Sequence, residues 1–164
     1  MTTQRRSYET GHRPKCLVIV DDTAEWDRAV YYASRWALRA GGGVVMLRII
    51  ETEDQNQQWL GVADIMRAEA QEEANVALDR ASGRANGIAA LTPERVIREG
   101  DPTEQILDVI DQDADIAMLV LAANSGPEGP GPLIAMLAGA VGSFPIPVTN
   151  ISGDLSDEAV DALS

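Results

Sequence analysis

The sequence is short of the residues on which many kinds of protein chemistry depend. Its 164 residues include one cysteine and one histidine. A single cysteine cannot form an internal disulfide, which fits the reducing cytoplasm. The only histidine, His12, lies in a polar N-terminal stretch. We therefore expect no Ser-His or Cys-His catalytic set inside the fold and no Cys/His metal cluster.

Positive charge and long apolar runs are also scarce. Asp and Glu outnumber Lys and Arg by 26 to 13, for a formal net charge of −13. A body this acidic repels nucleic acids and anionic membranes. No apolar run reaches membrane-spanning length, and the N-terminus lacks the apolar segment of a secretory signal. These features predict a cytoplasmic protein with no nucleic-acid or membrane partner.

The sequence does contain a regular alternation of strand and helix patterns. Short apolar runs typical of buried parallel strands occur at 16–20, 44–50, 95–98, 118–121 and 148–151. Helical patterns separate them, the longest at about 60–85. Such alternation predicts an open five-stranded parallel α/β sheet, Rossmann-like, with helices on both faces. The expected strand order is 3-2-1-4-5, with a ligand crevice where strands 1 and 4 diverge.

The two ends of the chain are expected to lie outside this sheet. Residues 1–13 have no periodicity and little to bury, which predicts a disordered tail. Residues 14–152 have the length of one domain with its own core. Residues 153–164 form either an acidic tail or a short helix.

Side-chain spacing also predicts details of the helices. The long helix should pack against the sheet along a face that begins with Val62, Ile65 and Met66. Asp22 or Thr23 is a suitable N-cap for the helix after the first strand.

Four stretches together resemble the universal stress protein family. CLVIVD at 16–21 resembles the family's first strand and aspartate, and VIREGDPTEQI at 96–106 resembles its third strand and the turn that follows. MLVL at 118–121 resembles the fourth strand, and PIPV at 145–148 resembles the entry to the fifth. The resemblance covers about residues 15–151. It implies an open five-stranded α/β fold, usually a homodimer, and a role in surviving stress.

The topology and the resemblance both indicate a candidate nucleotide crevice. A glycine-rich loop that leads into a helix is a common phosphate site. Asp21 resembles the family aspartate that touches adenine, and it could equally cap a helix. Together with Asp22 it could hold Mg²⁺ beside a phosphate. The crevice would be formed by Asp21, Asp22, Asn124, Ser125, Gly126, Gly129 and Gly131.

The loop nevertheless lacks much of what ATP binding requires. The family's ATP motif is Gly-x-x-Gly, nine residues, then Gly followed by Ser or Thr. Its literal match here begins at Gly126 and Gly129, but Ala140 stands where the hydroxyl should be. Three prolines in the loop each remove an N–H donor, and no Lys or Arg occurs between residues 122 and 144.

Two functions therefore stay open. The favoured one is a dimeric stress-response module that acts through contacts with an unknown protein partner, with weak or no ATP binding and no required cofactor. The alternative is an ATP- or AMP-binding switch, with Mg²⁺, in which slow ATP hydrolysis is an open question. The homodimer is expected to form through the edge strand, at Val148, Thr149, Asn150 and Ile151.

Overall fold

A parallel sheet of five strands runs through the centre of the protein. The structure is a computed structural model that describes residues 3–51 and 60–164. The strand order is β3-β2-β1-β4-β5, and neighbouring strands are parallel. The predicted fold class and strand order are therefore confirmed. The strands are β1 (Lys15–Ile19), β2 (Gly43–Ile50), β3 (Glu94–Glu99), β4 (Ile116–Ala123) and β5 (Val148–Ser152).

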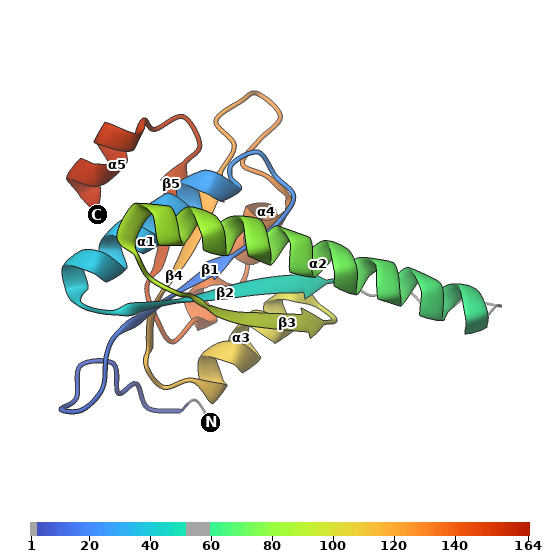
Figure 1. The fold of residues 1–164 in the computed structure, drawn as a ribbon, viewed down its shortest axis with the longest axis horizontal. Coiled ribbons are helices and arrows are strands. Elements are labelled where there is room, and N and C mark those ends of the chain that lie inside the picture. Colours follow the sequence, from blue (N-terminus) through green and yellow to red (C-terminus); the bar gives the residue numbers. More distant parts are fainter. Residues whose placement is uncertain (1–2, 52–59) are drawn as a thin grey trace.

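Helices cover both faces of the sheet (Figure 1). One face carries α1 (Trp26–Ala40), α2 (Leu60–Ala89) and α5 (Asp157–Leu163), and their buried side chains form one core. The other carries α3 (Pro102–Gln112) and α4 (Pro132–Ala138), which form the second core. A short 3-10 helix, Val141–Ser143, follows α4. None of the helices in the described residues is long and apolar enough to cross a bilayer.

The long helix α2 is buried over only part of its length. Leu78 and Ala81 are completely buried against the sheet and α1. The N-terminal half of the helix runs out beyond the ends of β2 and β3 (Figure 1). There Val62, Ile65 and Met66 are half exposed or more. The expectation that these three side chains pack on the sheet is wrong. The sheet ends before this part of the helix, and the helical spacing places Val62 and Ile65 on the side away from the buried Leu78 and Ala81.

The structure also corrects the expectation that the N-terminal tail is disordered. Residues 3–13 lie against the turn at 113–116, between α3 and β4. Nη1 of Arg5 donates to a carbonyl oxygen of this turn at 2.9 Å, and the backbone N–H of Arg6 donates to another at 2.8 Å. Nδ1 of His12 lies 2.6 Å from a carboxylate oxygen of the same turn. The lack of apolar residues did not predict this arrangement, because polar contacts hold the segment against the turn.

The C-terminal segment forms a helix, α5, that ion pairs tie to α1, and α1 is tied in the same way to α2. Asp27 accepts hydrogen bonds from Arg84 and Arg28, each at 2.7 Å. Arg28 also donates to Asp157 at 2.6 Å and to the carbonyl oxygen of Leu155 at 2.9 Å. Partial burial acts to raise the pKa of Asp27, but the two arginines outweigh it and lower that pKa below its usual value.

Deletion of residues 1–13 should lower the melting temperature by about 3–8 °C, since each kcal/mol shifts a protein of this size by about 2–4 °C. The deleted contacts include backbone and guanidinium hydrogen bonds to the turn at 113–116. Arg5→Ala should reproduce part of the loss. Arg6→Ala is the control, because its side chain pairs only with the exposed Glu9 among the described residues. Calorimetry on all three proteins tests this, and an unchanged melting temperature after deletion would show that the contacts contribute nothing.

Asp27→Asn should destabilise the protein by about 1–3 kcal/mol at neutral pH, because two arginines lose a charged acceptor. The pKa of Asp27 is lowered in the folded protein, so its contribution is present above pH about 4 and is lost as the pH falls through the depressed value. Urea unfolding of both proteins at pH 7 and pH 3 measures this. The difference should shrink at pH 3, and Asp154→Asn, an exposed site, should match the wild type at both.

Candidate functional site

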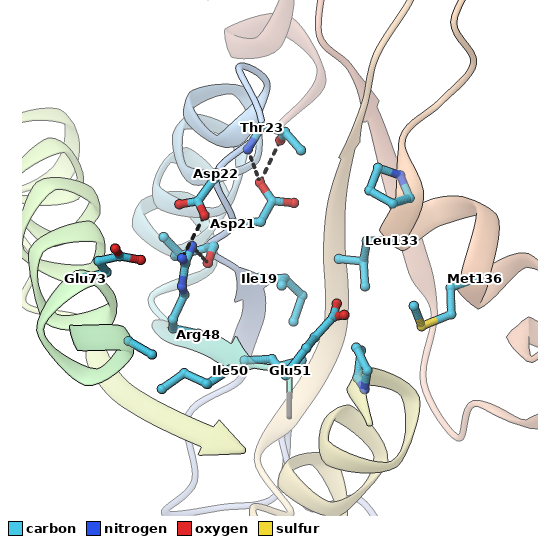
Figure 2. A pocket seen from close by; sticks show the side chains of 15 residues that line it. Ile19, Asp21, Asp22, Thr23, Arg48, Ile50, Glu51, Glu73, Leu133 and Met136 are labelled. Atoms are coloured by element: carbon cyan, nitrogen blue, oxygen red, sulfur yellow. Dashed lines mark hydrogen bonds and ion pairs between the residues drawn. The ribbon is translucent and has the colours of Figure 1, made fainter. Parts of the chain in front are cut away.

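A cleft of about 530 Å³ opens at the carboxyl ends of β1 and β2, beside the start of α4. Figure 2 shows its apolar floor, to which Ile19, Ile50 and Leu133 contribute. The rim is polar and carries the residues that follow β1 and β2. The position agrees with the predicted crevice on the β1 side. On the other side, the cleft is bounded by α4 instead of by the loop after β4.

Asp21 lines the cleft and also shapes the turn after β1. Its Oδ1 accepts hydrogen bonds from the backbone N–H of Thr23 at 3.1 Å and from the Thr23 hydroxyl at 2.6 Å. The expected capping of α1 by Asp22 or Thr23 is wrong. The helix begins after Glu25, whose side chain makes no capping hydrogen bond. Asp21 therefore holds the turn through one oxygen.

Arg48 is the cleft residue that sequence analysis missed. Its Nη2 donates to Oδ2 of Asp22 at 2.9 Å, and its Nη1 donates to the carbonyl oxygen of Val20 at 3.2 Å (Figure 2). The guanidinium is largely buried, and its hydrogen bond is the main reason that the pKa of Asp22 is lowered. A lone arginine inside the apolar strand sequence VVMLRII was the available signal.

The electrostatics of the cleft are dominated by carboxylates. Its described lining has one guanidinium, that of Arg48, against the carboxylates of Asp21, Asp22, Glu51 and Glu73, which gives a formal charge of −3. Because Arg48 is already paired with Asp22, little positive potential remains to attract an anion. The cleft therefore disfavours ligands with several negative charges.

The glycine-rich loop does not reach this cleft. The side-chain oxygen of Asn124 accepts from the N–H of Gly126 at 2.7 Å, and the N–H of Asn124 donates to the carbonyl oxygen of Pro130 at 3.1 Å. The loop thus closes on itself and stands away from the sheet (Figure 1). Of the predicted crevice, the structure brings only Asp21 and Asp22 to the cleft. The residues that do not line it are Asn124, Ser125, Gly126, Gly129 and Gly131.

The two aspartates offer a poor site for Mg²⁺. One oxygen of Asp21 is taken by Thr23, and one oxygen of Asp22 is taken by Arg48. Among residues 3–51 and 60–164, no group of three or more Asp, Glu, His or Cys side chains is placed to hold a metal ion. A metal would therefore depend on the second oxygens of these two carboxylates and on its own ligands.

Several solved structures are similar to this one. The universal stress protein UspA from Lactobacillus plantarum aligns with a TM-score of 0.72 at 20% identity, over 84% of this chain and 97% of that chain. A universal stress protein in complex with cAMP aligns with a TM-score of 0.60 at 15% identity, over 84% and 96%. The one from Archaeoglobus fulgidus in complex with dAMP gives 0.56 at 17%, over 84% and 97%. These identities show a shared fold.

Family membership is established by the sequence itself. No curated protein matches the chain. The sequence model of the universal stress protein family, however, matches residues 12–148, which span β1 to β4 and end at the first residue of β5. The resemblance of the four strand motifs is confirmed by this match, and the chain belongs to the universal stress protein family.

Proposed function

We propose that this stress protein acts through contacts with other proteins and binds ATP weakly or not at all. The observation that carries the proposal is the cleft with a formal charge of −3, from which the glycine-rich loop is turned away. A phosphate site needs several N–H donors directed at one point, or cations, and the cleft provides neither in quantity. With no catalytic residue set expected from the sequence, we infer that the protein is not an enzyme.

The negative charge of the cleft opposes ATP binding. Micromolar binding requires about 8 kcal/mol in total. A triphosphate brings several negative charges beside four carboxylates, and unpaired charges in a poorly hydrated site are costly. The one arginine of the described lining is already paired with Asp22 and Val20. Adenine contacts over the apolar floor are insufficient to offset this repulsion.

A nucleoside monophosphate is the second candidate ligand. The cleft volume of about 530 Å³ is in the range of small-molecule sites, and its floor is apolar. Proteins of similar fold have been solved with cAMP and with dAMP. One phosphate brings less repulsion than three. If a nucleotide regulates this protein, we propose that it is a monophosphate, held mainly through its base.

We also propose a homodimer that forms through β5. This strand is at the edge of the sheet, and in the described structure only β4 pairs with it. Antiparallel pairing of two β5 strands around a two-fold axis would satisfy the backbone groups of Val148–Ile151. Ile151 is already buried in the core of one chain, so the contact would rely on the backbone and on the exposed Asn150.

A cytoplasmic location is the remaining part of the proposal. The single cysteine, Cys16, is buried in β1, and burial raises the pKa of its thiol well above the usual value. It therefore acts as a packing residue that needs no oxidising environment.

Calorimetric titration of nucleotide-stripped protein should give an ATP dissociation constant of about 100 μM or weaker, with or without Mg²⁺. If charge is the reason, Asp22→Asn with Glu73→Gln should tighten ATP binding at least about threefold, because it removes two carboxylates and releases Arg48. Glu104→Gln with Glu158→Gln removes the same charge at exposed sites outside the cleft and should change little. Low-micromolar affinity in the wild type, lost in Asp21→Ala, would favour the nucleotide switch.

Light scattering at micromolar concentration should show a dimer. Asn150→Asp should shift the mass toward the monomer, since two-fold pairing brings the new charges close together on an edge strand. Asn86→Asp makes the same change on the exposed surface of α2 and should leave the dimer intact. A wild-type monomer, or equal effects of both substitutions, would rule out dimerisation through β5.

A further inference from the structure

Exposed apolar side chains are concentrated on α2. Val62, Ile65, Met66 and Val76 are 53%, 61%, 50% and 62% exposed, and they are four of the eight large apolar residues exposed to this degree in the described residues. The helix is 30 residues long, and its N-terminal half extends past the sheet (Figure 1). Neighbouring exposed apolar side chains often mark contact surfaces.

The exposed residues follow a regular spacing. Val62, Ile65, Glu69, Glu72 and Val76 are separated by alternating steps of three and four residues. This spacing places all five on one side of an α-helix and is the spacing of a coiled-coil seam. We call these five residues the outer seam of α2. The seam is apolar at both ends and acidic in the middle.

The outer seam is separate from the face that α2 packs against the sheet. That inner face contains the buried Ala74, Leu78 and Ala81. A groove of about 560 Å³ is lined by three seam residues, Glu69, Glu72 and Val76. The other lining residues are Asp22, Glu73, Ala77 and Arg80. The central and C-terminal residues of the seam therefore form one wall of a hollow.

The two acidic residues of the seam are available for pairing. Glu69 and Glu72 are exposed, and neither has an ion-pair partner among residues 3–51 and 60–164. The guanidinium of Arg80, one of the nearby cations, lies over the ring of Trp26 at 4.2 Å. A partner that covers the seam must therefore supply positive charge opposite its centre, since acidic side chains buried without cations are costly.

We propose that the outer seam of α2 docks a basic amphipathic helix of another protein. Apolar side chains of that helix would pack against Val62, Ile65 and Val76, and Lys or Arg side chains would pair with Glu69 and Glu72. This inference rests on the proposed function as a contact module and names the class of partner. Polar residues at seam positions are a known means of selecting one coiled-coil partner over others.

A second copy of the chain is a poorer occupant. Pairing two outer seams, parallel or antiparallel, brings the central acidic pair of one helix against that of the other, and like charges repel. The seam is also remote from the proposed dimer contact. The helix packs on α1 and β2, and β5 forms the sheet edge on the far side of β1 and β4. Dimerisation through β5 therefore leaves both seams open.

The test uses a fluorescein-labelled synthetic helix of about 21 residues, three heptads long. On the side of the peptide that is designed to face α2, the outer positions are leucine and the two central positions are lysine. Fluorescence anisotropy with the full chain should show binding that a scrambled peptide of equal composition does not match. Replacing the two central lysines by glutamate should weaken binding at least about tenfold.

Protein variants locate the binding surface. Ile65→Gln with Val76→Gln should weaken binding of the lysine peptide about tenfold. Leu38→Gln makes the same kind of change at an exposed position of α1 and should have no effect. Glu69→Lys with Glu72→Lys should reverse the preference, so that the glutamate peptide binds better than the lysine peptide. Circular dichroism of each variant checks that the fold is retained.

Three results would overturn the inference. Equal binding of the patterned and scrambled peptides would show unspecific charge attraction. Equal binding by the wild type and the Ile65→Gln, Val76→Gln variant would place the peptide elsewhere. A lower solution mass of that variant would identify a second copy as the occupant. None of these outcomes concerns the ATP titration, so tight ATP binding would refute the proposed function separately.

Discussion

The architecture depends on the burial of β1 on both faces. Cys16, Leu17 and Val18 have no exposed surface, and alternate side chains of this strand enter the two cores. A strand of this kind is stable only if helices cover both sides of the sheet. Both sides are covered here, because α1 and α2 pack on one face of the sheet and α3 and α4 pack on the other. Because the strands are parallel, their carboxyl ends meet at one edge, and the cleft lies there.

The cleft is acidic because the one arginine of its described lining is paired with a carboxylate of the same lining. Arg48 leaves the end of β2 and pairs with Asp22, which follows β1. The two segments are neighbours only because β1 and β2 are adjacent strands. The pair holds the edge of the cleft together and leaves three further carboxylates without a compensating cation in that lining. The described lining of the cleft thus has a formal charge of −3.

The helix α2 shows how one element can serve both the fold and an interaction. In its C-terminal half the small buried side chains of Ala77, Ala81 and Ala85 allow close packing against α1 and the sheet. Its N-terminal half has larger apolar side chains but no sheet beneath them. Periodicity alone assigned all of these residues to one buried face. The side of the helix on which each residue lies, together with the length of the sheet, decides which of them are covered.

The sequence by itself determined the strand and helix alternation, the strand order and the family, because periodicity and short motifs report local backbone geometry and burial. It also identified Asp21 and Asp22 as cleft residues, since they directly follow a buried strand. It did not determine the pairing of Arg48 with Asp22 or the docking of residues 3–13 on the turn at 113–116. Only the tertiary structure decided these, because such polar contacts join segments far apart in the chain and depend on where each strand, helix and loop ends in space.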